Sequence, residues 1–182
     1  MHTSTTSTAV LTPWSAAQLQ QATQGYWLNG RAPSTEIKRI LTDSRHAEAG
    51  DAFLALKGER FDAHDFVAQV AASGCQVAIV SQPVDADIFQ LVVSDTRLAL
   101  GHLGAYRRAQ YPDLKVIALT GSSGKTTTKE MLGSILSRLA PTLITRGNLN
   151  NDLGVPVMLL ELRPEHQYAV MELGASHQGE ID

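Results

Sequence analysis

The sequence predicts an α/β fold, in which a small α/β domain is followed by the beginning of a second domain built on a parallel sheet. Two observations carry this prediction. Short apolar runs typical of buried strands alternate with segments of helical periodicity along the 182 residues, and such alternation favours helices layered on a parallel sheet. A glycine-rich turn at residues 121–127 lies between one such strand and one such helix, where nucleotide-binding sheets hold phosphate.

The first domain is predicted to span residues 13–112. It follows a tail of residues 1–12 that is rich in Ser and Thr and is expected to be disordered. Thr12 and Pro13 predict the N-cap and the first position of a helix that ends near Gly25. The chain is therefore expected to enter the domain through a short helix.

Five strands and two more helices complete the predicted first domain. Residues 26–28 predict the opening strand, and Asn29-Gly30 predicts a tight hairpin turn behind it. The helix predicted over residues 96–111 is amphipathic and is expected to bury Leu98, Leu100, Leu103 and Tyr106. The remaining predicted elements are strands at residues 37–42, 52–56, 77–80 and 91–93 and a helix at residues 64–72 that Gly74 ends.

Pro112-Asp113 is typical of a hinge, so residues 113–182 are predicted to form the first part of the second domain. The helix after the glycine-rich turn has an expected apolar face of Met131, Leu132, Ile135, Leu136 and Leu139. Around it the sequence predicts strands at residues 116–120, 143–144 and 168–173, a polar loop at 147–154 and a short helix at 155–162. A sheet of about three strands ending in a polar turn is a poor end for a domain, so we expect this one to continue beyond Asp182.

Composition and charge narrow the classes of partner and the cellular compartment. The formal net charge of −3 gives no general attraction to nucleic acid or acidic membranes. Cys75 is the single cysteine, so a reducing compartment is expected. The first residues lack the basic start and apolar core of a secretory signal, and no apolar run approaches the ~20 residues that cross a bilayer. We therefore expect a cytoplasmic monomer without a nucleic-acid partner or membrane insertion.

The strongest functional signal is the turn Gly121-Ser122-Ser123-Gly124-Lys125-Thr126-Thr127. Its glycines let backbone N–H groups curl around phosphate oxygens, and the positive end of the following helix adds to that field. Lys125 supplies a full charge for the β- and γ-phosphates of ATP, and the Thr126 hydroxyl is placed to coordinate Mg²⁺. The spacing is shorter than the common Walker pattern, which has glycine where this chain has Leu119. The alternative is a helix-capping turn with an unrelated lysine, but the order strand, turn, Gly-Lys-Thr and helix favours phosphate binding.

Three stretches of the chain resemble the Mur ligase and folylpolyglutamate synthetase superfamily of ATP-dependent, amide-bond-forming enzymes. They are the shortened turn at residues 119–127, the loop Gly147-Asn148-Leu149-Asn150-Asn151-Asp152-Leu153-Gly154-Val155-Pro156, and the string Met171-Glu172-Leu173-Gly174-Ala175-Ser176-His177-Gln178-Gly179-Glu180-Ile181. The resemblance implies a P-loop ATPase domain that uses ATP and Mg²⁺. It further implies that Lys125 and Glu172 are catalytic, and that Thr126 and Glu172 are the metal ligands.

The same resemblance assigns substrate contacts to the loop and the string. It implies that Asn148, Asn150, Asn151 and Ser176 face the nucleotide and sugar-peptide substrates. The alternative is that the asparagines are turn and cap residues. For Glu172 the alternative is a solvated carboxylate at the end of a strand, although the carboxyl edge of a parallel sheet is where such sheets bind ligands.

The first domain resembles the part of the family that holds the UDP of a UDP-sugar peptide. The resemblance rests on residues 41–45 and 50–66, including Asp62-Ala63-His64 where many relatives have Asp-Gly-His. Ser44 and backbone groups of the turns can read the uracil edge, and Arg45 and Lys57 can offset the charge of the diphosphate. The alternative is that Asp43 and Arg45 form a structural pair and that His64 caps the following helix.

The implied reaction joins UDP-MurNAc-tripeptide to D-alanyl-D-alanine and converts ATP to ADP and phosphate. The peptide carboxylate attacks the γ-phosphate, and the incoming amine displaces phosphate from the resulting acyl phosphate. The sequence shows no Ser-His-Asp or Cys-His arrangement, and this mechanism requires no side-chain nucleophile. Two alternatives stay open: a ligase that adds an amino acid to UDP-MurNAc-dipeptide, and a non-catalytic module that binds nucleotide or UDP-sugar. Since further domains are expected after Asp182, the chain alone is expected to be inactive.

Overall fold

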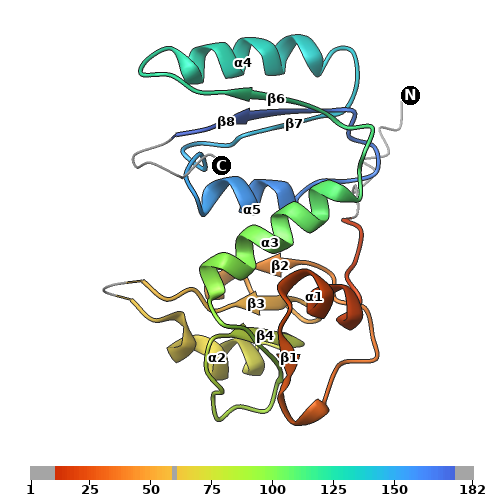
Figure 1. The fold of residues 1–182 in the computed structure, drawn as a ribbon, viewed down its shortest axis with the longest axis vertical. Helices are drawn as coiled ribbons and strands as arrows, with labels where there is room; N and C mark the ends of the chain where they lie inside the picture. Colours follow the sequence, from red (N-terminus) through yellow and green to blue (C-terminus); the bar gives the residue numbers. More distant parts are fainter. Residues whose placement is uncertain (1–10, 59–60, 175–182) are drawn as a thin grey trace, which may run out of the picture.

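The computed structural model describes residues 11–58 and 61–174, which form two sheets of mainly parallel strands with helices on both faces of each (Figure 1). This confirms the predicted α/β class. Within the described residues the first sheet has the strand order β1-β5-β4-β3-β2 and the second has the order β6-β8-β7. β1 runs antiparallel to β5, and the other paired strands are parallel. The predicted boundary at Pro112-Asp113 falls between the two sheets, and the domain limits themselves stay predictions.

Strands and helices follow one another in the predicted order. The strands are β1 (Tyr26–Trp27), β2 (Ile40–Leu41), β3 (Ala52–Leu54), β4 (Val77–Val80), β5 (Phe89–Val92), β6 (Lys115–Leu119), β7 (Thr142–Ile144) and β8 (Tyr168–Glu172). The helices are α1 (Ala16–Thr23), α2 (Val67–Ala72), α3 (Thr96–Ala109), α4 (Lys125–Leu136) and α5 (Gly154–Leu160). Short 3₁₀ turns are η1 (Leu28–Gly30), η2 (Ser44–His46) and η3 (Ala63–Phe66).

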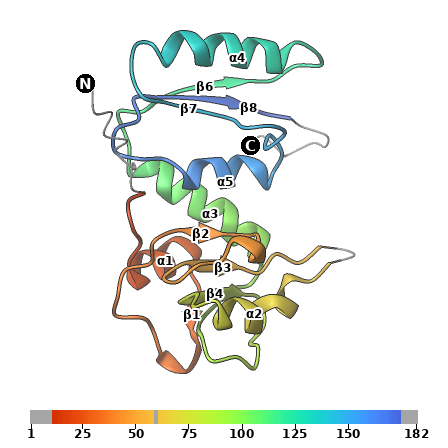
Figure 2. The ribbon, with the colours of Figure 1, turned by 180° about the vertical axis from the view of Figure 1, so that it is seen from behind.

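The first sheet is covered by α1 and α3 on one face and by α2 on the other (Figures 1 and 2). Neighbouring strand residues point to opposite faces. Leu54 and Ile79 therefore pack in the core with α3, whereas Phe53 and Ala78 pack in the core with α2. Both faces are buried, which explains why β3 and β4 are continuous apolar runs without alternation.

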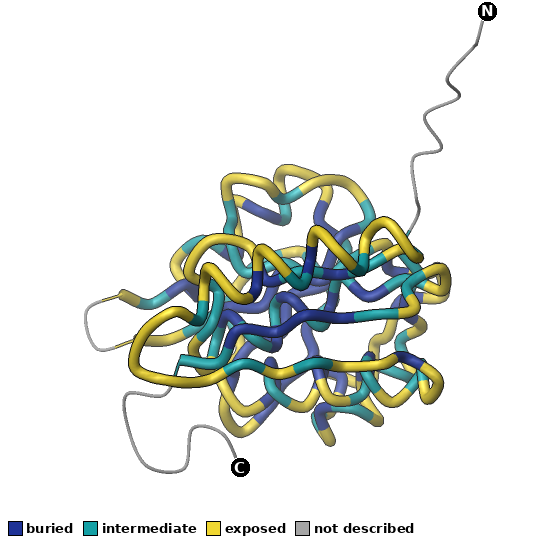
Figure 3. Tube along the Cα trace, turned by 90° about the horizontal axis from the view of Figure 1, so that it is seen from above, coloured by how far each residue is buried: buried dark blue, intermediate teal, exposed yellow. Residues whose placement is uncertain are grey.

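The second sheet lies between α4 and α5 (Figure 1). Ala169 and Met171 of β8 pack in one core with Met158 of α5. Glu172 points to the opposite face, where Lys129 of α4 is its ion-pair partner. Buried residues run through the strands in the interior, and exposed residues follow the outer helices and loops (Figure 3). The buried ion pair of the second sheet therefore lies on the face that α4 covers.

Helix α1 begins three residues later than predicted. Its N-cap is Ser15, whose hydroxyl accepts from the N–H of Gln18 while the Gln18 side chain accepts from the N–H of Ser15. This reciprocal capping box satisfies two free helix donors, and Thr12 and Pro13 have no part in it. Trp14 instead forms a backbone bridge to Ile37 and lies outside the helix.

The predicted hairpin at Asn29-Gly30 was wrong, although the turn itself forms. Both residues have positive φ, 55° and 67°, as a tight turn requires. Residues 31–36 then stay outside the sheet, since they include Pro33 and lack an apolar alternation. β1 pairs with the distant β5, Tyr26 opposite Val92, and a local signal cannot reveal that partner.

The predicted apolar faces of two helices need correction. In α3, Leu98 is 61% exposed, and the buried side is centred on Leu100, Leu103 and Arg107. In α4 the predicted residues Met131 and Ile135 are exposed, as is Leu139 beyond the end of the helix, and the buried residues are Lys129 and Gly133. Helical spacing shows which residues share a stripe, but the neighbouring elements decide which stripe is covered.

Helices α3 and α5 join the two halves of the described chain (Figures 1 and 2). They approach so closely that a Cβ built on Gly104 would lie 2.9 Å from the backbone Cα of Pro156. An ion pair between Arg97 and Asp152 lies at one end of the same contact. Leu160 of α5 belongs to the core of the first sheet, so apolar side chains pack across the junction between the two halves.

The residues that precede α1 are held against the C-terminal end of α3. Arg107 is buried, stacks on Trp14 with its guanidinium carbon 4.1 Å from the ring centre, and donates to the carbonyl oxygen of Thr12 at 2.8 Å. The Thr12 hydroxyl also bonds the Tyr111 hydroxyl. Residues 1–10 of the predicted tail lie outside the described residues.

Across residues 11–58 and 61–174, the structure has no helix whose length and hydropathy would let it cross a bilayer.

Replacing Gly104 with Ala is expected to lower the free energy of unfolding by about 1–3 kcal/mol, because the new methyl group overlaps Pro156. Gly101 is the matched control on the same helix, since among the described residues its Cβ would meet nothing within 4 Å. Gly101→Ala should raise the free energy of unfolding by about 0.5–1 kcal/mol through helix propensity. Urea denaturation measures both, and equal effects would contradict the close α3–α5 packing.

Cys75 is expected to be inert in the folded chain. Burial raises the pKa of its thiol to about 11, so at pH 8 the native thiol is almost wholly protonated and cannot act as a nucleophile. Labelling with a disulfide reagent at pH 8 should be at least about 100-fold slower than in the urea-unfolded chain. The chain has no second cysteine to contribute signal, and equal rates would show that this region opens readily.

Candidate functional site

The predicted phosphate turn connects β6 to α4 and has the backbone that anion binding requires. Gly121 and Gly124 have φ of 144° and 78°, which a residue with a Cβ adopts only with strain. Among the described residues no side chain caps α4, so its first N–H groups stay available to a phosphate. Lys125 opens α4, and its ammonium donates to the carbonyl oxygen of Gly121. The other predicted turn residues, Ser122, Ser123, Thr126 and Thr127, are exposed.

Glu172 lies at the carboxyl end of β8, the central strand of the second sheet, opposite Leu119 at the end of β6. That register places the carboxylate beside the turn. The hydroxyl of Thr126 donates to Glu172 Oε2 at 3.1 Å, and the Asn150 amide donates to Oε1 at 3.1 Å. Glu172 is only 3% exposed, so it is not the solvated strand-end carboxylate of the alternative.

The charge state of Glu172 follows from a balance of burial and partners. Burial alone would raise the pKa of this carboxyl group. Hydrogen bonds from Asn150 and Thr126 and the nearby charges of Lys129 and Lys125 outweigh burial and hold the pKa below its ordinary value. Glu172 is therefore ionised at neutral pH, as a cation ligand must be.

Lys129 is the site residue that sequence reasoning missed. It is 1% exposed, and its Nζ lies 3.6 Å from Glu172 Oε2 and 3.1 Å from Glu130 Oε1. The sequence did contain an indication of this role, because Lys129 follows Lys125 at the i, i+4 spacing of a helix and so lies on the same face of α4. The sequence does not show that this face is the buried one.

The asparagine loop contributes one residue to the Glu172 cluster. The side-chain amide of Asn150 donates to Glu172, and the backbone carbonyl oxygen of Asn150 accepts from the N–H of Gly174 at 2.7 Å. The side-chain oxygen of Asn151 instead accepts from the N–H of Gly154 at the start of α5, which matches its alternative role as a turn residue. Asn148 is exposed, and the predicted Ser176 lies outside the described residues.

Ser44 and Arg45 line a separate cavity of about 420 Å³ in the first half of the chain. Its other lining residues are Thr42, Asp43, Phe53, Phe61, Ala63 and Phe66. The rings of Phe61 and Phe66 stack with centres 5.6 Å apart. The guanidinium of Arg45 bonds Asp43 at 2.6 Å and lowers the pKa of that carboxyl group. The structure therefore shows the Asp43–Arg45 pair of the alternative interpretation.

His64 is buried and links η3 to Ser81, the residue that follows β4. Its Nδ1 lies 2.5 Å from Asp62 Oδ1, and its Nε2 accepts from the backbone N–H of Ser81 at 2.9 Å. Asp62, not His64, caps η3. Ser81 Oγ is 3.2 Å from Nε2, so the fold does bring together a Ser-His-Asp set that the sequence did not show. The N–H bond already occupies the Nε2 lone pair, and the set is therefore a structural link.

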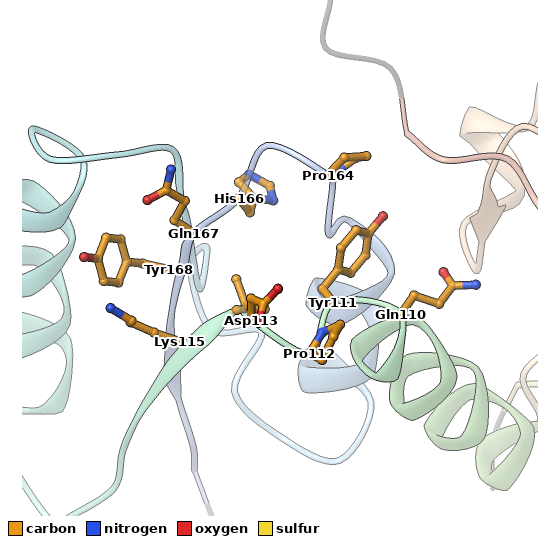
Figure 4. Close-up of a pocket in the computed structure, with 10 residues that line it drawn as sticks. Gln110, Tyr111, Pro112, Asp113, Lys115, Pro164, His166, Gln167 and Tyr168 are labelled. Carbon is orange, nitrogen blue, oxygen red and sulfur yellow. The ribbon is translucent and has the colours of Figure 1, made fainter.

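A cavity of about 360 Å³ lies at the opposite end of the second sheet from the phosphate turn (Figure 4). It is bounded by the linker after α3 and by the first residues of β6 and β8. Burial lowers the pKa of His166 in its wall. None of the residues predicted to bind substrate, nucleotide or metal lines this cavity.

The donor set near the phosphate turn fits a magnesium ion. Mg²⁺ prefers oxygen ligands and keeps several waters, so in nucleotide sites one or two protein ligands and the phosphates suffice. Thr126 supplies a hydroxyl and Glu172 an ionised carboxylate on the same side of the sheet. The absence of any cluster of three His, Cys, Asp or Glu side chains among the described residues is consistent with such a sparse site.

Comparison with known proteins identifies two adjoining family segments. Residues 36–118 match the Mur ligase family catalytic domain, and residues 119–182 match the Mur ligase middle domain. A curated relative, UDP-N-acetylmuramoyl-tripeptide–D-alanyl-D-alanine ligase of Escherichia coli strain K12, is 56% identical over 156 residues, which are 85% of this chain and 34% of that protein.

Two solved structures extend the comparison. MurF from Acinetobacter baumannii is 84% identical, with a TM-score of 0.92 over 94% of this chain and 38% of that one. MurF ligase from Thermotoga maritima, solved in complex with ADP, is 33% identical, with a TM-score of 0.68 over 79% of this chain and 33% of that one. The chain therefore spans little more than a third of the length of the relatives that it matches.

Replacing Glu172 with Gln should destabilise the fold, because Lys129 would lose its buried partner. We expect the free energy of unfolding to fall by about 2–4 kcal/mol at pH 7. Glu130→Gln is the control, since Glu130 pairs with the same ammonium from the exposed side and should cost less than about 0.5 kcal/mol. Urea unfolding of the two variants tests this, and a larger loss for Glu130→Gln would show that the buried pair is not the important one.

Proposed function

Since the chain belongs to the Mur ligase family, we propose that it is the UDP-sugar-peptide-binding and nucleotide-binding part of an ATP-dependent ligase of peptidoglycan precursor synthesis. The full protein would add D-alanyl-D-alanine to UDP-MurNAc-tripeptide. The names of the E. coli and A. baumannii relatives support this choice of substrates. We place the ligase in the cytoplasm as a monomer, where ATP and the UDP-linked precursor are both present.

One observation carries the nucleotide part of the proposal. The uncapped start of α4, Lys125 and the Thr126–Glu172 pair converge at one edge of the second sheet. The helix start would hold an anion, and Thr126 and Glu172 would hold a divalent cation at the same edge. The ADP bound in the T. maritima relative supports the same assignment.

In the proposed reaction the chain acts by position and charge. The backbone of residues 121–127 holds the phosphates, and Lys125 releases its bond to Gly121 to neutralise the transferred phosphoryl group. Thr126 and Glu172 would hold Mg²⁺, which supplies further neutralisation of the phosphates when bound. The substrate carboxylate then attacks the γ-phosphate and displaces ADP to give an acyl phosphate, from which the amine of D-alanyl-D-alanine displaces phosphate.

We assign the cavity at Ser44 and Arg45 to the UDP of the sugar peptide. Its stacked phenylalanines offer apolar surface to the uracil ring, and Arg45 offers a guanidinium to the diphosphate. Binding would require Arg45 to turn from Asp43, which is feasible for an exposed pair. The remaining predicted contacts, Asn148, Asn150, Asn151 and Ser176, stay assigned to substrate as a proposal.

Two other functions make different predictions. A ligase that adds an amino acid to UDP-MurNAc-dipeptide shares the phosphate turn, and it would prefer the dipeptide. A non-catalytic module would bind nucleotide or UDP-sugar peptide, and no longer form of the protein would turn over ATP. Asn150 favours the first proposal, because it links the loop that resembles the D-alanyl-D-alanine-adding members to the Glu172 carboxylate.

Calorimetric titration of the chain with UDP-MurNAc-tripeptide, UDP-MurNAc-dipeptide and ATP–Mg²⁺ tests the proposal. We expect tighter binding of the tripeptide than of the dipeptide. Lys125→Ala should weaken ATP–Mg²⁺ binding at least about tenfold, because a phosphate loses its charged donor, and should leave sugar-peptide binding unchanged. Lys115→Ala, at the other end of the same sheet, is the control for loss of a lysine charge. Equal or absent binding of both sugar peptides by folded chain would overturn the assignment of the first domain.

A further inference from the structure

We propose that Lys129 is a built-in counter-charge for Glu172, which makes Mg²⁺ binding at this site depend on the nucleotide. The inference rests on the proposed function and deepens it, since it concerns how the same site selects its occupants. In the absence of nucleotide the ammonium of Lys129 balances the Glu172 carboxylate. The phosphates of the nucleotide then bring the negative charge that lets the metal bind.

The position of Lys129 supports this role. The residue lies in the second turn of α4, and its side chain is enclosed between the helix and β8, with Nζ 3.6 Å from Glu172 Oε2. A lysine is almost never fully buried unless it is paired. Its second partner, Glu130, lies on the exposed side, where solvent screens it. The buried charge of Lys129 is therefore directed at the proposed metal ligand.

The other partners of Glu172 leave the charge balance to Lys129. Thr126 and Asn150 satisfy the carboxylate oxygens with neutral donors, so they orient the group without changing its charge. Lys125 also carries a positive charge, but it is held at the Gly121 carbonyl oxygen and faces the phosphate turn. Removing Lys129 would leave a buried, oriented carboxylate without its ion-pair partner, with only the weaker influence of the Lys125 charge. A divalent cation is strongly attracted to such a carboxylate.

A counter-charge role and a purely structural role of Lys129 predict opposite changes in metal affinity when Lys129 is replaced. If Lys129 only held Glu172 in place, its loss would misplace a ligand and weaken metal binding. If Lys129 is a counter-charge, its loss strengthens metal binding in the absence of nucleotide. The sign of the change separates the two.

The experiment is a titration of the chain with Mn²⁺ as a paramagnetic stand-in for Mg²⁺, with free Mn²⁺ counted by its electron paramagnetic resonance signal. Without nucleotide we expect Lys129→Met to bind Mn²⁺ at least about tenfold more tightly than the wild-type chain. Lys115→Met controls for general loss of a lysine charge and should match wild type. Adding Glu172→Gln to Lys129→Met should abolish the gain, which places the bound ion at Glu172.

The wild-type chain provides a second measurement that does not depend on how well the variant folds. Wild type should bind Mn²⁺ at least about tenfold more tightly with ADP present than without it. Equal Mn²⁺ affinity with and without ADP, or weaker binding by folded Lys129→Met, would overturn the inference. If wild type binds no ADP–Mn²⁺ at all, the proposed nucleotide site itself fails, and the two failures are thereby distinguished.

Discussion

The alignment of β8 between β6 and β7 is the constraint on which the candidate site depends. Parallel strands present their carboxyl ends at one edge of a sheet. Because Leu119 pairs with Glu172, the turn that leaves β6 and the carboxylate that ends β8 lie side by side. Two segments about 50 residues apart in sequence become one site by backbone pairing alone. A shift of one residue in the register of β8 would turn Glu172 to the α5 face, and the phosphate turn would then have no carboxylate beside it.

A buried carboxylate then imposes its own requirements on the surrounding residues. Burial disfavours the ionised form, and Glu172 stays charged because a hydroxyl and an ammonium from α4 and an amide from the loop before α5 converge on it. Each of these donors also belongs to another part of the fold. Thr126 belongs to the turn, Asn150 to the loop before α5, and Lys129 to the buried side of α4. The cluster thereby connects the turn, the loop and α4 through one carboxylate.

The junction of α3 and α5 connects this unit to the rest of the chain. The close approach at Gly104 and Pro156 and the ion pair of Arg97 with Asp152 hold α5 and the loop before it against the first half. Asp152 lies two residues from Asn150, the donor to Glu172. The cavity at Ser44 and the phosphate turn therefore belong to halves that meet through packed helices. This packing sets the position of the cavity relative to the turn.

The sequence by itself determined the α/β class, the order of the elements and the chemistry of the phosphate turn. These are local properties, set by apolar runs, helical spacing and the need for glycine at Gly124. It also indicated Glu172 through its place at a strand end. Only the tertiary structure decided which stripe of a helix is buried, which strand pairs with β1, and which side chains meet across elements. Lys129, His64 with Ser81, and Asn150 with Glu172 acquire their partners from residues 17 to 43 positions away, and no local pattern encodes contacts over that distance.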